Sequence, residues 1–407
     1  MNVLHILPYV PDIKSGAHVR DHNLIKYLSK EGVTSQVICN VDESDELNNI
    51  TSLERELNTK IYITKAPKQS SLKKMEIVLF YHMFPPIHRY NTSTHKGMIS
   101  SILKKNSFDI IHAQHIIEAA PTIEAISDVS FKGCKIITLH NVDHLLFMKE
   151  INLQKNPLMK FAYKRAASGL KEHELNILSK FDYIFVVSEV DKSIYISKGI
   201  PKNKIDVIPN GVDCNIFNPE KIADKNALAH PNVLFMGKMD YIPNKIAIKI
   251  YLHQIHQIIR KEVPKIKFYI IGKNYPEWLK EYSKIDSSVE IIGFVEDVRP
   301  YIQSADVCIS PLTMGSGTRL KILEYLAMGK PVVSSTIGAE GLEVEDNKNI
   351  LIADEWDEFA NKIIALLNNN HLAKKIGANG RKLVEEKYNW KNVVEKQIRV
   401  YEKLLKR

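Results

Sequence analysis

Short, continuously apolar segments alternate with longer segments of helical periodicity along nearly the whole chain. The apolar segments are rich in β-branched residues, which is typical of strands covered by helices on both faces. Strands are predicted at Val3–Leu7, Ser35–Cys39, Lys60–Thr64, Asp109–Ala113, Lys135–Leu139, Tyr183–Val187, Asp206–Ile208, Asn232–Met236, Lys267–Ile271, Val289–Ile292, Val307–Ser310, Pro331–Ser334 and Ile350–Ala353. Helix-length segments such as His18–Lys30 and Asn244–Lys261 lie between them. The alternation predicts an α/β fold in which crossover helices join parallel strands.

The sequence between residues 209 and 231 indicates a division of the chain. Pro209-Asn210-Gly211-Val212-Asp213 has turn composition, and polar residues follow until a new strand pattern begins at Asn232. We therefore predict two doubly wound domains over residues 1–215 and 216–387, and a helix over residues 388–407 that packs back toward the first domain. Because ligands bind at the carboxyl ends of the strands in such sheets, we expect a cleft between the domains.

Composition fits a globular protein with two domains. The chain has 407 residues, of which 44% are hydrophobic and 25% are charged. No apolar run approaches the ~20 residues needed to cross a bilayer, and the N-terminal segment lacks the pattern of a signal peptide. The 4 cysteines form no Cys-x-x-Cys pair, so we expect a cytoplasmic protein with reduced thiols.

The net charge of +9 is concentrated between residues 60 and 105. This stretch has nine basic residues against a single acid, Glu76, and it contains the aromatic cluster Phe80–Pro86. Basic and aromatic residues together suit either nucleic acid or an anionic membrane surface, while a solvated face over a core helix explains them equally well. No nucleic-acid-binding motif accompanies the patch. We therefore expect no nucleic-acid partner, and we favour peripheral association with the inner face of the plasma membrane over nucleic-acid binding.

The most informative segment is a glycine-rich loop that follows a predicted strand and leads into a predicted helix. Glycines such as Gly317 allow the backbone to approach a ligand closely. The helix start offers free N–H groups to a phosphate, and Arg319 and Lys321 place positive charge in the expected first turn. Glu324 follows, where its carboxylate could accept hydrogen bonds from sugar hydroxyls. The loop predicts a site for a nucleoside diphosphate.

The loop after the first strand carries a weaker signal. It lacks Gly-x-Gly-x-x-Gly, which argues against a nicotinamide or flavin cofactor. The Gly16 backbone could nevertheless touch a phosphate or sugar, with Arg20 one turn later, although an ordinary loop and helix cap would look the same.

Two later loops also follow strands. Lys238 and Lys245 flank a helix entry, where an ammonium could neutralise a diphosphate leaving group, although lysines are usually just solvated. The backbone of Phe294 and Val295 could contact a nucleotide base.

Several histidines invite a metal interpretation. Pairs with ligand-like spacing are His112 and His115, His140 and His144, and His18 and His22. None has a matching cysteine or a His-Glu-x-x-His context, so we expect no metal site. His140 ends an apolar strand and is therefore a candidate for the active site, although a histidine satisfied by backbone groups is the alternative.

The loop Pro311–Glu324, with Pro209–Asp213 and Gly293–Asp297, resembles the retaining nucleotide-sugar glycosyltransferases of the group-1 or family-four class. The resemblance covers essentially the whole chain and is strongest from Pro209 to Gly341. It implies a GT-B fold of two facing Rossmann-like domains, with the donor mainly on the C-terminal domain and the acceptor mainly on the N-terminal one.

The resemblance also assigns residues. Glu324 matches the second glutamate of the Glu-x7-Glu motif and would hold the ribose, whereas Ser316 replaces the first, which leaves the donor sugar undefined. Lys238 stands where the family often has an arginine that binds phosphate, and Gly16 matches the glycine loop near the donor phosphate. His140 matches the histidine beside the reacting sugar. The partner lysine of the family has two candidates here, Lys245 and Lys321.

The mechanism implied by this resemblance is departure of a nucleoside diphosphate and attack by the acceptor on the same face of the sugar. Lys238, Arg319, Lys321 and the amides of Gly317 and Thr318 would stabilise the leaving charge without a metal or other cofactor. The implied role is sugar transfer to a saccharide or lipid-linked acceptor in synthesis of a cell-surface polysaccharide or glycolipid. A sugar-nucleotide epimerase on the same fold and a non-catalytic sugar-nucleotide-binding protein are the alternatives.

Overall fold

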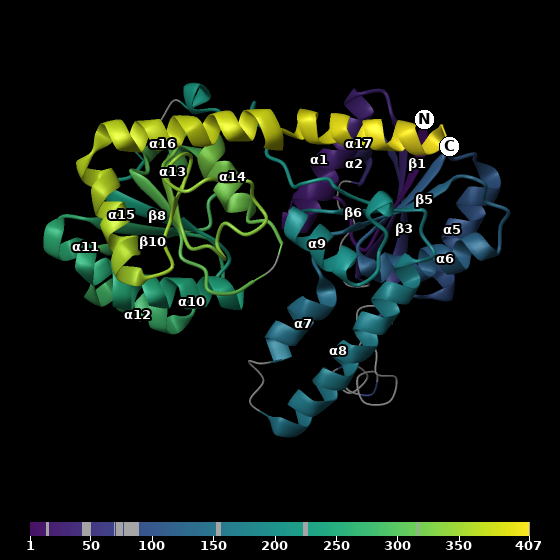
Figure 1. Cartoon of the computed structure of the whole chain (residues 1–407), viewed down its shortest axis with the longest axis horizontal. Coiled ribbons are helices and arrows are strands. Elements are labelled where there is room, and N and C mark those ends of the chain that lie inside the picture. The colour runs from purple at the N-terminus through teal and green to yellow at the C-terminus, as the bar shows by residue number, and fades with distance from the viewer. Residues whose placement is uncertain are drawn as a thin grey trace. The chain divides into compact units, whose positions relative to one another are not determined.

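The computed structural model describes residues 1–13, 16–42, 50–68, 70, 76, 89–151, 156–222, 227–315 and 317–406. The chain forms two compact units, unit 1 from Met1–Pro209 with Val393–Arg407 and unit 2 from Asn210–Asn392. Figure 1 shows that each unit is a sheet with helices packed on its faces. The unit boundaries lie after residues 209 and 392, whereas the domain boundaries predicted from the sequence lie after residues 215 and 387.

Unit 1 is built on a parallel sheet of seven described strands in the order β3-β2-β1-β4-β5-β6-β7. Its strands are β1 Asn2–Leu7, β2 Thr34–Asp42, β3 Lys60–Ala66, β4 Ile110–Gln114, β5 Cys134–Leu139, β6 Tyr183–Val186 and β7 Ile205–Val207. Val3 of β1 pairs with Ser35 on one side and with Ile110 on the other. The strand order reverses at β1 and β4, and ligands of doubly wound sheets bind at such a point.

Helices cover both faces of this sheet. The helices described in this unit are α1 Gly16–Lys30, α2 Ile50–Leu57, α5 Ser93–Lys105, α6 Ala119–Ser127, α7 Asp143–Ile151, α8 Pro157–Leu178, α9 Glu189–Ser197 and most of α17 Trp390–Leu405, with the short 3-10 turns η1 Ile116–Glu118 and η2 Lys202–Lys204. Ile99 of α5 packs with Ile38 and Ile111 on one face, while Ile25 of α1 packs with Val37 on the other. Helices α7 and α8 pack together as a pair that extends away from the sheet (Figure 1).

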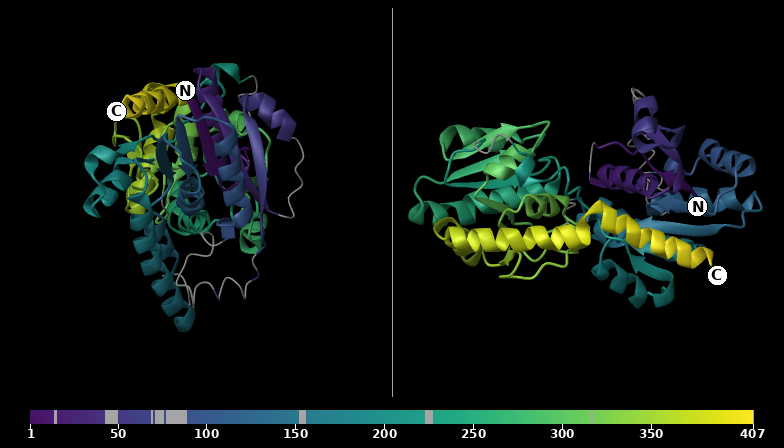
Figure 2. Two further views of the ribbon diagram at one scale, coloured as in Figure 1. Left: turned by 90° about the vertical axis from the view of Figure 1, so that its right-hand side faces the viewer. Right: turned by 90° about the horizontal axis from the view of Figure 1, so that it is seen from above.

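The C-terminal helix α17 is anchored to unit 1 by buried polar contacts. The helix is drawn in yellow in Figure 2, and its residues from Val393 onward belong to unit 1. The Tyr401 hydroxyl lies 2.5 Å from Nδ1 of His112 in β4, and Gln397 donates a hydrogen bond of 2.6 Å to the same hydroxyl. Nε2 of His112 lies 2.7 Å from the hydroxyl of Thr138 in β5, so both ring nitrogens have partners.

Unit 2 is built on a parallel sheet of six described strands in the order β10-β9-β8-β11-β12-β13. Its strands are β8 Asn232–Met236, β9 Lys267–Ile271, β10 Val289–Gly293, β11 Val307–Ser310, β12 Val332–Ser334 and β13 Leu351–Ile352. Its helices are α10 Ile242–Ile250, α11 His256–Glu262, α12 Glu277–Ile285, α13 Arg299–Ser304, α14 Leu320–Ala327, α15 Trp356–Asn368 and α16 Asn370–Leu383, with the 3-10 turn η3 Pro219–Lys221 and the π-turns η4 Tyr251–Ile255 and η5 Val384–Tyr388.

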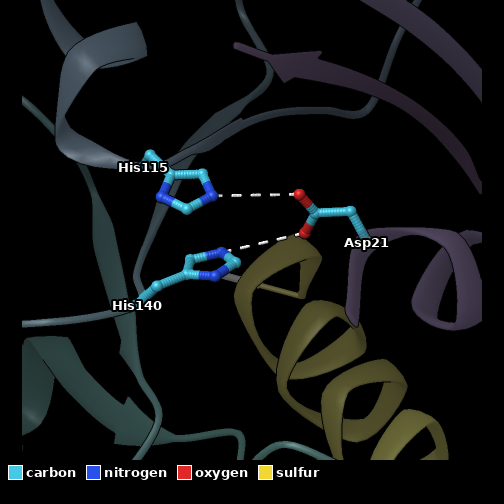
Figure 3. Close-up of side chains that lie close together, drawn as sticks. All are labelled: Asp21, His115 and His140. Carbon is cyan, nitrogen blue, oxygen red and sulfur yellow. Dashed lines mark ion pairs between the residues drawn. The ribbon is translucent and has the colours of Figure 1, made fainter. Parts of the chain in front are cut away.

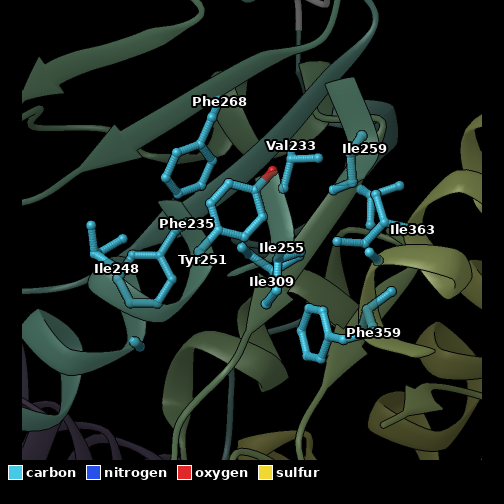
Figure 4. Packing of buried hydrophobic residues seen from close by; sticks show 14 of the residues in the cluster. Val233, Phe235, Ile248, Tyr251, Ile255, Ile259, Phe268, Ile309, Phe359 and Ile363 are labelled. Carbon is cyan, nitrogen blue, oxygen red and sulfur yellow. The ribbon is translucent and has the colours of Figure 1, made fainter. Parts of the chain in front are cut away.

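Alternate residues of the central strand β8 enter two separate cores. Val233 and Phe235 pack in one cluster with Tyr251 and Phe359 (Figure 4), whereas Leu234 packs in a cluster on the opposite face. This burial on both faces explains the continuously apolar strands in the sequence.

Every strand predicted from the sequence overlaps an observed one, so the α/β prediction is confirmed. The helix predicted over Asn244–Lys261 consists of α10, the π-turn η4 and α11 in succession. The apolar pattern continues across the change in helix type, so the sequence did not reveal the interruption. Among the described residues, no helix has the length and apolar character needed to cross a membrane.

Candidate functional site

In unit 2 the site begins at Gly237, the first residue after β8. A Cβ atom at this position would lie 2.5 Å from Nδ2 of Asn244 and 3.1 Å from Nζ of Lys321. The backbone N–H of Gly237 donates to the carbonyl of Ile271, which holds the loop close to β9. Only glycine leaves room here for the two polar side chains, so the strand end is shaped around them.

Lys321 connects this loop to helix α14. Its ammonium lies 3.0 Å from Oδ1 of Asn244 and 4.0 Å from the ring centroid of Phe235, and Nδ2 of Asn244 donates to the carbonyl of Lys238 at 2.9 Å. Burial lowers the pKa of Lys321 to about 7, with a further lowering from Arg319. An anion placed beside this ammonium would favour its charged form.

Glu324 follows one turn later on α14. Burial raises the pKa of its carboxyl to about 7, and the nearby Lys321 opposes this rise. Hydrogen bonds donated to a carboxylate favour its charged form. A ligand that presents anionic oxygens to Lys321 and hydroxyl donors to Glu324 would therefore stabilise the charged forms of both side chains.

The glycine-rich loop before α14 has the backbone conformation that its glycines predict. Gly315 and Gly317 have φ angles of 128° and 71°, a region that side chains disfavour. Arg319 is the N-cap of α14 and its guanidinium turns back to donate to the carbonyl of Gly317 at 2.6 Å. Arg319 therefore precedes the first turn of α14, and the prediction that it lies within that turn is wrong by one residue. Thr318 Oγ1 is buried and has no hydrogen-bond partner among the described residues, whereas Ser316 lies outside them.

The other sequence-based candidates in unit 2 lie on loops or helix starts. Lys238 is exposed and Lys245 is half-buried, and neither ammonium has a hydrogen-bond or ion-pair partner within the described part of the chain. Phe294 has 60% of its surface exposed, and Nζ of Lys273 lies 3.6 Å from its ring centroid. Val295 packs against the core.

In unit 1 the loops after β1, β4 and β5 bring together side chains that the sequence did not connect. Tyr9 follows β1, His115 follows β4 and His140 follows β5, while Asp21 lies on α1. The Tyr9 hydroxyl lies 2.9 Å from Oδ2 of Asp21 and 2.5 Å from Nε2 of His115. Nε2 of His140 lies 3.7 Å from Oδ1 of Asp21, and the two imidazoles are stacked with centroids 3.6 Å apart (Figure 3).

Burial dominates the electrostatics of this cluster. It raises the pKa of Asp21 to about 7, a rise that Arg20 and Tyr9 oppose. It lowers the pKa of His115 to about 3 and that of His140 well below its usual value, so both imidazoles are neutral at physiological pH. The cluster therefore presents hydrogen-bonding groups rather than cations to a ligand.

Two sequence-based candidates lie beside this cluster on α1. Gly16 is the first residue of the helix. The buried Arg20 guanidinium donates to the carbonyls of Pro209 and Ile208 at 2.7 and 2.9 Å, which fixes the chain after β7.

One group of described side chains could in principle hold a metal ion. Asp21, His115 and His140 bring metal-ligand atoms within 4.8 Å of one another. However, the two stacked imidazole planes differ by only 21°, so their in-plane lone pairs run side by side instead of converging on one ion. The histidines that ligand-like spacing pairs with His115 and His140 have other partners. His112 bonds Tyr401 and Thr138, and His144 bonds Glu174.

The basic stretch of residues 60–105 is described only in part. Lys96 pairs with Glu124 at 2.8 Å, and Arg89 donates to the carbonyl of Pro67. Lys73, Lys74 and the aromatic cluster Phe80–Pro86 lie outside the described residues.

Comparison with known proteins places both units in one enzyme group. Residues 15–216 match the glycosyltransferase family 4 domain, and residues 230–369 match the glycosyl transferases group 1 domain. A 44.6 kDa protein of the cps region of Klebsiella pneumoniae is 29% identical over 64% of this chain and 66% of its own length. A phosphatidyl-myo-inositol mannosyltransferase of Mycobacterium tuberculosis is 28% identical over 48% of this chain and 53% of its own length.

Solved structures resemble this chain over nearly its whole length. A glycosyltransferase from Rickettsia africae superposes with a TM-score of 0.73 and 18% identity, covering 100% of this chain and 98% of that one. Anabaena Alr3699/HepE in complex with UDP and glucose superposes with a TM-score of 0.67 and 14% identity, covering 98% and 99%. The two Rossmann-like sheets are thus those of the GT-B fold, and the two matched domains show that the chain belongs to the group 1 family of glycosyltransferases.

Proposed function

We propose that this glycosyltransferase moves a sugar from a nucleoside diphosphate sugar to a saccharide or lipid-linked acceptor, with retention of the anomeric configuration. The observation that carries the proposal is the pair of Asn244 and Lys321 beside Gly237, with Glu324 near Lys321 on the same helix α14. It combines a cation for a diphosphate with a carboxyl group for sugar hydroxyls at the carboxyl end of a central parallel strand, where such folds bind their ligands.

In this proposal the cations of unit 2 stabilise the departing nucleoside diphosphate. Lys321 faces the strand end, Arg319 is held by the carbonyl of Gly317, and Lys238 is exposed on the intervening loop. One preorganised group of this kind contributes about 10²–10³ to the rate. We propose that this set of cations makes a metal unnecessary, and undiminished transfer in EDTA would support that view.

Retention is supported by the match of Glu324 and His140 to the positions of the retaining family. A lipid-linked or polysaccharide acceptor is suggested by the two relatives, one named for a lipid substrate and one from a cps region.

We retain an anionic membrane surface as a proposed partner of residues 60–105. The test is a vesicle sedimentation assay of a variant in which four lysines, Lys73, Lys74, Lys104 and Lys105, are replaced by glutamate. Unchanged binding to anionic vesicles would refute the membrane proposal.

The donor is tested first by thermal shift with a panel of nucleoside diphosphate sugars. A ligand at 100 times its dissociation constant stabilises the folded state by about 2.7 kcal/mol, and Lys321→Met should abolish the shift. The anomeric configuration of the product, measured by proton coupling constants, then tests retention. Transfer that inverts the anomeric centre would refute that part of the proposal.

A further inference from the structure

We propose that Asp21 is a positioning residue that fixes the tautomers of two stacked histidines, His140 directly and His115 through the hydroxyl of Tyr9. Only the catalytic consequence of this inference rests on the proposed function. The hydrogen-bond arrangement belongs to unit 1 alone and can be tested without a substrate.

The link to His115 follows from the single proton of the Tyr9 hydroxyl. That hydroxyl contacts Oδ2 of Asp21 at 2.9 Å and Nε2 of His115 at 2.5 Å, so it donates to one and accepts from the other. An ionised carboxylate can only accept, so Tyr9 then donates to Asp21 and accepts from an N–H at Nε2 of His115. Protonated Asp21 can instead donate to the Tyr9 oxygen, which allows Tyr9 to donate to His115 and reverses that tautomer.

The link to His140 follows from two facing polar atoms. Oδ1 of Asp21 and Nε2 of His140 lie 3.7 Å apart, both are buried, and neither has a hydrogen-bond partner among the described residues. Buried polar atoms are rarely left without a partner. A shift of under 1 Å would close the contact with His140 donating from Nε2, so that the same carboxylate would orient both rings (Figure 3).

The arrangement leaves Nδ1 of each ring as an acceptor for a ligand hydroxyl. Neither Nδ1 has a hydrogen-bond partner within the described part of unit 1. The φ angle of His115 is 73°, which is unfavourable for a residue with a side chain. Such an angle persists only where the surrounding structure holds it, so the position of this ring is specifically fixed. The backbone N–H of His115 is held at 2.9 Å from the carbonyl of Thr138. Two acceptors on stacked rings would match two neighbouring hydroxyls of a sugar.

The groups that face Asp21 are therefore Tyr9, His115, His140 and Arg20, and the Arg20 guanidinium is already bonded to the carbonyls of Ile208 and Pro209. Beyond Tyr9, the ring of His18 stacks on the phenol and pairs with Asp12. His18 also helps to lower the pKa of His115. Substitution of Tyr9 changes the link to His115 alone, whereas substitution of Asp21 changes the links to both rings, so the two variants separate the two arms of the arrangement.

The test is a tautomer measurement on the full chain labelled with ¹⁵N-histidine, by long-range ¹H–¹⁵N correlation at pH 8. His115→Gln and His140→Gln spectra assign the two rings. We expect both rings in the Nε2–H form, a changed His115 signal in Tyr9→Phe, and changed signals of both rings in Asp21→Asn. Tyr183→Phe is the matched control, because it removes a 2.7 Å hydrogen bond from a tyrosine to Asp206 elsewhere in the unit.

Unchanged histidine signals in Asp21→Asn would overturn the inference. If that variant does not fold, unchanged His115 signals in Tyr9→Phe would overturn it instead. Shifts of both rings on adding one equivalent of Zn²⁺, lost in Asp21→Asn, would assign the three side chains to a metal and also overturn it.

Activity links the arrangement to catalysis. Once a donor is identified, we expect Asp21→Asn to lower kcat about 10²-fold, on the scale of one oriented catalytic group, with KM within threefold of the wild type. Altered tautomers in a protein without transferase activity would contradict the proposed function and leave the arrangement itself intact.

Discussion

The ammonium nitrogen of Lys321 lies 3.0 Å from the side-chain oxygen of Asn244, a residue 77 positions earlier in the chain. The contact joins the first helix after β8 to the helix after β11, and it crosses the space left by Gly237. A cation held in this way is oriented before a ligand arrives, so little reorganisation accompanies binding.

Lys321→Met should abolish most of the transfer activity. The substitution keeps an apolar chain beside Phe235 and removes the charge together with the hydrogen bond to Asn244, so we expect a loss of about 10²–10³ in rate and a folded protein. Lys249→Met is the matched control, because Lys249 lies on α10 with its ammonium 5.1 Å from the ring centroid of Trp278. Equal activity of the two variants, measured as release of the nucleoside diphosphate, would contradict the assigned role of Lys321.

Gly237→Ala should weaken binding of the donor nucleotide and destabilise unit 2. The new methyl group would lie 2.5 Å from Nδ2 of Asn244, and overpacking of this kind costs about 1–3 kcal/mol. Gly97→Ala is the comparison, because a Cβ atom there meets nothing within 4 Å in the interior of α5. That change should stabilise the protein by about 0.5–1 kcal/mol. A neutral Gly237→Ala in urea unfolding would show that Asn244 and Lys321 move aside without cost.

The strands and the glycine-rich loop could be predicted because their signals are local. A continuous apolar run identifies a strand covered on both faces, and Gly315 and Gly317 adopt the backbone angles that a glycine permits. The unit 1 cluster could not be predicted, because Tyr9 and His115 are 106 residues apart and neither is unusual in its own segment.

The spacing of His112 and His115 in the sequence does not reflect a shared environment in the structure. His112 lies within β4 and bonds Tyr401, whereas His115 follows the strand with a positive φ angle and bonds Tyr9. Two residues that look like one ligand pair therefore belong to different environments. The positive φ angle of His115, directly after the end of β4, separates them, and no sequence pattern predicted it.

Glu324→Gln should change how stability depends on pH. Because burial raises the pKa of Glu324 from 4.5 to about 7, the folded state binds more protons than the unfolded state between these values. The contribution of this group to stability is therefore lost as the pH rises from 4.5 to 7. The amide carries no charge, so the variant should exceed the wild type in stability at pH 8 and match it at pH 4. Urea unfolding at both pH values measures this, and a difference that is larger at pH 4 would contradict the burial argument.

Tyr401→Phe should destabilise unit 1 and leave nucleotide binding unchanged. The hydroxyl that it removes is shared by Nδ1 of His112 and Nε2 of Gln397, and all three side chains are buried. Leaving a buried donor or acceptor without its partner costs about 1–3 kcal/mol, and the phenyl ring keeps the packing of α17 against Phe185. Chemical unfolding measures the loss, and hydrogen exchange should show earlier opening of β4 than of β8. If the stability falls by less than about 0.5 kcal/mol, the range of ordinary surface substitutions, then apolar packing alone holds α17 in place.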